Sequence, residues 1–287
     1  MHILSRSSTD LEQLSKRTEL AGRVELQILN EFLNHKQARD IVKDIDDYVL
    51  SIDSVHCPLY PGWEFTLDNI YDTEVKRNIT ETCRLAQMIA ERKMSRIYVV
   101  FHSGFSMSES TKKKTWGKIK LMFKDLVRDY PLVDFLIENL MPYRIIDNVI
   151  YLRNGYFHDA VEMSKELGES FGSERFGTTL DISHAEVTCN FFNRLFNSHA
   201  LSIESYFHDY KDSCKLLHMS DTIGLGFDGK HGIAFNPDRT DKIKRYLDLY
   251  DKYNYACDIV LEVREDDYNN PINFERNYKD IKRILKQ

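Results

Sequence analysis

Short apolar segments alternate with longer amphipathic segments along the whole chain, and this alternation restricts the fold more than any other feature. Eight short segments are predicted to be buried strands, over residues 2–5, 24–29, 52–57, 97–101, 133–138, 178–181, 215–218 and 259–263. The segments after them have helical periodicity, over residues 10–20, 36–49, 73–93, 112–129, 158–167, 189–197, 243–253 and 274–285. Eight strand–helix units within 287 residues predict an α/β fold, the (β/α)₈ TIM barrel, as a single domain over residues 1–287.

A doubly wound open sheet is the main alternative for an alternating chain. That fold normally carries a glycine-rich phosphate-binding turn after an early strand. No such turn follows the first or second predicted strand of this chain. The pattern therefore favours the barrel.

Composition excludes several classes of protein. The chain is 42% hydrophobic and 29% charged, as in soluble globular proteins, and its net charge of −6 provides no overall basic field for nucleic acid. Its five cysteines form no CxxC pair, which argues against a disulfide framework or a thiolate zinc site. No segment has the pattern of a signal peptide or a membrane span. We expect a cytoplasmic protein without membrane contact; its oligomeric state does not follow from the sequence.

Imidazole and carboxylate side chains gather where the predicted strands end. They are His56, His102, Glu138, Asp181 with His184, His218, then Asp221, Asp228 and His231 in the following loop, and Glu262 on the last strand. In a barrel of this kind the carboxyl ends of all strands meet on one face. Several carboxylates that converge there would repel one another unless a cation lay between them. The pattern predicts a divalent metal site, and Zn, Mn, Fe and Co all accept this mixture of ligands. Arg264, directly after the last strand, suits an anionic or polyhydroxy substrate.

The motifs at these strand ends resemble those of the xylose-isomerase-like TIM-barrel superfamily. They are VHCP (55–58), FHSG (101–104), IEN (137–139), LDISHA (180–185), HMSD (218–221) and LEV (261–263). The superfamily contains sugar isomerases and epimerases, inositol-pathway enzymes and the endonuclease IV class of abasic-site nucleases. The resemblance covers nearly the whole chain and does not choose between these branches.

The epimerase branch implies one bound divalent ion, Mn, Zn, Co or Fe. Its ligands would be Glu138, Asp181, His218 and Glu262, and the two glutamates would also transfer the proton. His184, Asp221 and Arg264 would contact the substrate. The resemblance therefore predicts a metal-dependent isomerase or epimerase of a sugar or sugar phosphate.

The endonuclease IV branch implies two or three zinc ions and is the alternative. His56, His102, His184, His231 and Asp228 would supply the further ligands, and abasic-site DNA would be the partner only in this case. Two features depart from that branch. Asp228 and His231 are separated by two residues instead of one, and residues 5–10 (SRSSTD) lack the glycine-rich segment of these nucleases. A barrel that keeps the fold and serves only as a binding module is a third, less favoured possibility.

Overall fold

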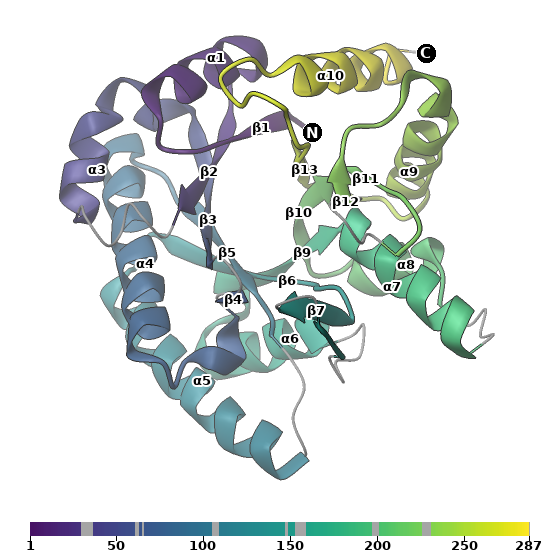
Figure 1. The fold of residues 1–287 in the computed structure, drawn as a ribbon. Helices are drawn as coiled ribbons and strands as arrows, with labels where there is room; N and C mark the ends of the chain where they lie inside the picture. Colours follow the sequence, from purple (N-terminus) through teal and green to yellow (C-terminus); the bar gives the residue numbers. More distant parts are fainter. Residues whose placement is uncertain are drawn as a thin grey trace.

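In the computed structural model, eight parallel strands close into a barrel surrounded by helices (Figure 1). The structure describes residues 1–29, 37–60, 63–64, 66–104, 109–146, 149–152, 159–196, 201–225 and 231–286. The barrel strands are β1 (Ile3–Ser7), β2 (Val24–Leu29), β3 (Ile52–Tyr60), β5 (Ile97–His102), β6 (Val133–Glu138), β9 (Phe176–Asp181), β10 (Cys214–Met219) and β13 (Asp258–Leu261). Each pairs in parallel with the next, and β13 pairs with β1 to close the ring. The predicted TIM barrel is confirmed.

Helices cover the outside of the barrel (Figure 1). They are α1 (Leu11–Ala21), α3 (Ala38–Asp44), α4 (Thr73–Lys93), α5 (Glu109–Asp129), α6 (Asp159–Phe171), α7 (Ile182–Phe196), α8 (Ile203–Tyr210), α9 (Thr240–Lys252) and α10 (Ile272–Ile284). Local signals fix α1: the Asp10 side chain accepts a hydrogen bond from the backbone of Gln13, and Gly22 ends the helix at a φ of 75°. Among the described residues, no helix is both long and apolar enough to cross a membrane.

Several elements differ from the prediction. β1 continues to Ser7 and so includes Arg6, and the helix predicted over residues 36–49 is divided into α3 and a 3₁₀ helix (Asp46–Ser51). α7 begins at residue 182 instead of 189. The short helix α8, the strand β4 (Trp63–Glu64) and the hairpins β7 (Tyr143–Ile146) with β8 (Val149–Leu152) and β11 (Asp221–Thr222) with β12 (His231–Ile233) were not predicted. These pieces are too short for a clear hydrophobic period.

A small layer of apolar side chains fills the barrel interior, and the ionisable side chains lie directly beyond it towards the carboxyl ends of the strands. Leu4, Val100, Leu136, Leu216 and Val260 come from five different strands and form one buried cluster. Side chains of a strand alternate between its two faces, so the residue two positions later points into the barrel again. Those residues are Arg6, His102, Glu138, His218 and Glu262. Along each of these strands, the inward-facing side chain therefore changes from apolar to ionisable between one residue and the residue two positions later, at the carboxyl end of the barrel.

Candidate metal centre

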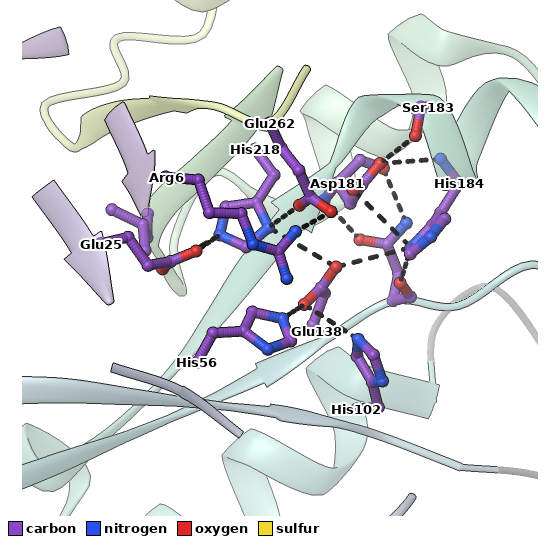
Figure 2. Close-up of polar contacts among 12 residues, drawn as sticks. Arg6, Glu25, His56, His102, Glu138, Asp181, Ser183, His184, His218 and Glu262 are labelled. Carbon is purple, nitrogen blue, oxygen red and sulfur yellow. Dashed lines mark hydrogen bonds and ion pairs between the residues drawn. The ribbon is translucent and has the colours of Figure 1, made fainter. Parts of the chain in front are cut away.

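Four side chains from neighbouring strands converge at the carboxyl end of the barrel (Figure 2). Glu138 ends β6, Asp181 ends β9, His218 lies on β10 and Glu262 directly follows β13. Each offers one nitrogen or oxygen atom, and these atoms all lie within 4.8 Å of one another. We call these residues the central tetrad. The resemblance to the epimerase branch implies these same four residues as ligands of a single divalent ion, and the structure brings them together.

Two facing atoms of the tetrad lack the partners that buried polar atoms usually have. Nδ1 of His218 and Oε2 of Glu262 lie 3.0 Å apart. In the part of the chain that the structure describes, both atoms are buried and neither forms a hydrogen bond. Nδ1 of His218 also lies 3.6 Å from Oε1 of Glu138. Lone pairs directed at a common point are the arrangement that a divalent cation requires, so this donor set fits a metal ion.

Asn139 holds the β9 side of the tetrad in place. Its side chain donates to the carbonyl of Asp181 at 2.9 Å and accepts from the backbone N–H of Asp181 at 2.7 Å. The Oδ1 atom of Asp181 accepts from the Ser183 hydroxyl at 2.9 Å and the His184 backbone N–H at 2.8 Å. The other carboxylate oxygen is thereby turned towards the centre of the barrel.

Glu25 is a site residue that the sequence reasoning did not identify. It lies on β2, is fully buried, and approaches Nε2 of His218 at 3.2 Å (Figure 2). The Ser54 hydroxyl donates to the same carboxylate at 2.9 Å. His218 thus has one ring nitrogen against Glu25 and the other against the tetrad. Carboxylates in this position commonly orient imidazole ligands of metal ions.

Burial and ion pairing oppose each other in the charges of the tetrad. Burial alone would lower the pKa of His218, but the Glu25 and Glu138 carboxylates raise it to about 10. Burial alone would raise the pKa of Glu25, but His218 lowers it to about 2. The pKa of Glu138 is likewise lowered well below its usual range, because His218 and His102 outweigh its burial. Without a bound cation, a protonated His218 supplies positive charge to the cluster.

Three more imidazoles surround Glu138. Nε2 of His56 lies 2.9 Å from Oε2 of Glu138, Nε2 of His102 lies 3.5 Å from the same atom, and Nδ1 of His184 lies 3.5 Å from Oε1. Nδ1 of His56 faces the Cys57 carbonyl at 2.8 Å and must carry a hydrogen there. Both ring nitrogens of His56 therefore face oxygen atoms, and Nε2 is the one that faces the tetrad.

The pKa values of His102 and His184 are shifted in opposite directions. Burial is the main reason that the pKa of His102 is lowered well below its usual value. Burial also disfavours a charged His184, but Asp181 and Glu138 outweigh it and raise the pKa of this histidine. The ring of His231, on β12, lies 6.0 Å from the ring of His184. His231 is half-buried and extends the row of imidazoles to the rim of the barrel.

A cavity of about 530 Å³ opens beside the tetrad. Predicted site residues that line it are His102, His184, His231, Glu262 and Arg264. Arg264 is exposed, and its backbone N–H donates to the Gly232 carbonyl at 2.8 Å. Arg6, which was not predicted, also lines the cavity and forms an ion pair with Glu262.

Two predicted site residues are not brought into this arrangement. Asp221 is buried and forms an ion pair with Lys242, which also contacts Glu186 at 2.5 Å. Asp221 is not among the residues that line the cavity, and its role as a substrate contact stays a prediction. Asp228 lies outside the described residues.

Comparison with known proteins finds solved structures that share the fold of this chain at low sequence identity. No family model and no curated protein matches the chain. A D-tagatose 3-epimerase-like protein is 16% identical with a TM-score of 0.62, and the alignment covers 100% of this chain and 97% of that one. An AP endonuclease of family 2 from Brucella melitensis is 14% identical with a TM-score of 0.60, over 96% and 98%. The IolI protein with a bound zinc atom is 14% identical with a TM-score of 0.58, over 99% and 96%. The chain therefore shares the TIM-barrel fold of these proteins.

Proposed function

We propose that the protein is a divalent-metal-dependent isomerase or epimerase that acts on a sugar or sugar phosphate. The observation that carries the proposal is the central tetrad. In it, three carboxylates and one imidazole meet within 4.8 Å at the carboxyl end of the barrel. Sugar epimerases are among the solved structures that share the fold, which supports this choice of chemistry.

The tetrad would hold the metal ion and would also carry out the proton transfer. When bound, a divalent cation polarises the carbonyl of a hydroxy-ketone and makes the neighbouring C–H group more acidic. Glu138 ends β6 and Glu262 follows β13, and these strands are separated by β9 and β10, so the two carboxylates reach the proposed metal site from different sides. One carboxylate accepts the proton of the substrate C–H bond, and the opposite carboxyl group returns a proton to the same or the adjacent carbon. Asp181 and His218 complete the set of ligands.

Glu25 would act as a positioning residue. Its carboxylate accepts from Nε2–H of His218 and so leaves Nδ1 of that ring free to bind the metal ion. Ser54 fixes the carboxylate from β3. This arrangement determines the orientation and the tautomer of the one imidazole in the tetrad.

Hydrogen exchange tests the proposal directly. Metal-loaded protein is incubated in D₂O with ketoses, ketose phosphates and keto sugar acids, and deuterium next to the carbonyl is followed by NMR. We expect exchange that depends on the metal ion and is lost in Glu138→Gln. Failure of every substrate to exchange with metal-loaded protein would contradict the proposal.

Phosphodiester hydrolysis with two or three zinc ions is the second candidate. It is favoured by one observation, the presence of four imidazoles within 3.6 Å of the Glu138 carboxylate, from His56, His102, His184 and His218. An AP endonuclease is among the proteins that share the fold. Cleavage of a duplex that contains one abasic site, in the same preparation, separates this activity from proton exchange.

A further inference from the structure

One wall of the cavity consists of hydrogen-bond donors. It is formed by Arg6 on β1, Arg17 on α1 and Gln27 on β2, all of which line the cavity. Arg17 is 2% exposed and Gln27 is 9% exposed. The Arg6 side chain is 13% exposed and lies beside Glu262 (Figure 2). We call these three residues the donor wall.

Most of the donors in this wall have no acceptor in the part of the chain that the structure describes. Nε and Nη2 of Arg6, Nε of Arg17 and Nε2 of Gln27 are buried and form no hydrogen bond. The nearest carboxylates already have partners. Glu262 is paired with the remaining nitrogen of Arg6, and Glu265 accepts from two backbone N–H groups as well as facing Arg17 at 3.5 Å. Buried donors are rarely left unpaired, so these donors require an acceptor that the described residues do not supply.

The charge of the cavity lining differs from that of the whole protein. The chain has a net charge of −6, yet three guanidinium groups and one carboxylate are found among the described lining residues: Arg6, Arg17, Arg264 and Glu262. Glu138 and Asp181 are not lining residues; they belong to the tetrad, where the proposed cation offsets their charge. A concave surface that concentrates positive charge favours an anionic ligand.

We propose that the donor wall binds the anionic oxygen group of the substrate, a phosphate ester or a carboxylate. The proposal rests on the proposed function, because the same cavity would hold the reacting carbon next to the tetrad. The two unpaired nitrogens of Arg6, Nε and Nη2, suit two oxygens of one anion, and the Gln27 amide supplies a further donor. A neutral ketose offers hydroxyl groups that both donate and accept, so it matches a wall whose unpaired side-chain atoms are all donors less well than an anionic oxygen group does. The substrate is therefore a sugar phosphate or a sugar acid.

Calorimetric titration of the metal-loaded protein with inorganic phosphate tests the subsite. Gln27→Leu removes one donor at similar side-chain size, and we expect phosphate to bind about tenfold more weakly. Gln27→Glu places a negative charge in the wall and weakens binding at least as much. Gln37→Glu is the matched control, because Gln37 is exposed, lies outside the cavity and makes no side-chain capping bond. Equal phosphate affinity in the wild type and both folded Gln27 variants would overturn the proposal.

A second measurement uses the wild type alone and so does not depend on how the variants fold. Proton exchange is compared among a neutral ketose, its phosphate and a keto sugar acid, and acetate is titrated beside phosphate to tell the two anions apart. We expect kcat/KM for one of the anionic substrates to exceed that for the neutral ketose at least tenfold. Equal values would overturn the subsite and leave the isomerase proposal intact. Phosphate binding that weakens in the Gln27 variants, without proton exchange on any sugar, would instead support the anion subsite and contradict the isomerase proposal.

Discussion

The two ends of the barrel both carry charged side chains, and they arrange them in opposite ways. At the amino end, carboxylates at the start of the strands are matched by cations. Asp134 on β6 contacts Nε of Arg96 at 2.9 Å and Nε of Arg175 at 3.3 Å. Asp53 on β3 contacts Lys93 at 2.7 Å and Arg23 at 2.8 Å. Each of these two carboxylates lies within 3.3 Å of two cationic side chains, so its charge is matched at the start of the strands.

At the carboxyl end, four carboxylates face imidazoles and one guanidinium. They are Glu25, Glu138, Asp181 and Glu262, and Arg6 forms an ion pair with Glu262 (Figure 2). Such a cluster costs free energy in the metal-free chain, since buried charges of one sign repel and lose their hydration. The contrast teaches that a carboxylate on a barrel strand indicates function when no Lys or Arg side chain is matched to it. Paired charge at the other end indicates stability.

The largest effect is expected from Glu138→Gln. This change removes a metal ligand and a proton-transfer group while it keeps the shape of the side chain. We expect the rate of proton exchange to fall about 10³-fold or more, together with the metal content. In chelator-treated protein the free energy of unfolding should change little, because relief of repulsion offsets the lost contact with His56. A Glu138→Gln protein that retains wild-type exchange would contradict the role of this carboxylate.

Asp134→Asn is the corresponding change at the amino end. It leaves Arg96 and Arg175 without their shared carboxylate, and Asp134 is only 6% exposed. We expect the free energy of unfolding in urea to fall by about 3 kcal/mol. Exchange activity per folded molecule should stay at the wild-type level. If this variant lost activity without losing stability, the division between the two ends would be wrong.

A smaller effect is expected from Glu25→Gln. The amide cannot stabilise the Nε2–H of His218 as a carboxylate does, so we expect metal affinity to fall about 10–100-fold. Competition with a chromophoric chelator measures this affinity, and the visible spectrum of the cobalt-loaded protein reports the altered ligand field. Glu12→Gln is the matched control, since Glu12 is exposed and far from the tetrad in sequence, and its side chain contacts Lys16 and Asn269. Equal affinity in both variants would remove Glu25 from the site.

The smallest effect is expected from His231→Gln. His231 lies at the rim, next to His184 and outside the tetrad. If one ion is bound, metal content should be unchanged and kcat/KM should fall less than tenfold, through lost substrate contacts. Loss of one ion per chain in this variant would instead support the multi-zinc phosphodiesterase.

Much of this comparison could be predicted from the sequence. A strand that ends in an ionisable residue two positions after a buried apolar one, as Leu136 and Glu138 do, must direct that residue into the barrel. Glu138, His218 and Glu262 follow this rule, whereas Asp181 comes two positions after Thr179. The resemblance to a known superfamily was needed to select these four residues as ligands. Glu25 was overlooked because it lies inside the segment VELQIL, where alternation alone is also typical of a strand with one solvated face.

Arg6 and Asp221 show what local pattern does not reveal. The first strand was expected to end at Ser5, so Arg6 was assigned to a loop; its pairing with β2 extends the strand to Ser7. Asp221 follows His218 closely in sequence, but β11 pairs with β12 and turns its carboxylate towards Lys242. Both outcomes depend on strand pairing between distant segments, which a single sequence does not encode in a short-range pattern.

Metal content per chain tests the central claim most directly. Protein purified without chelator is analysed for Mn, Fe, Co and Zn against an accurate protein concentration, together with Glu138→Gln prepared in the same way. The account predicts one divalent ion per wild-type chain and a clearly lower content in the variant. A wild-type protein that binds no divalent ion even after incubation with these metals would contradict the account. Two or three zinc ions per chain would contradict the one-ion isomerase and favour the phosphodiesterase.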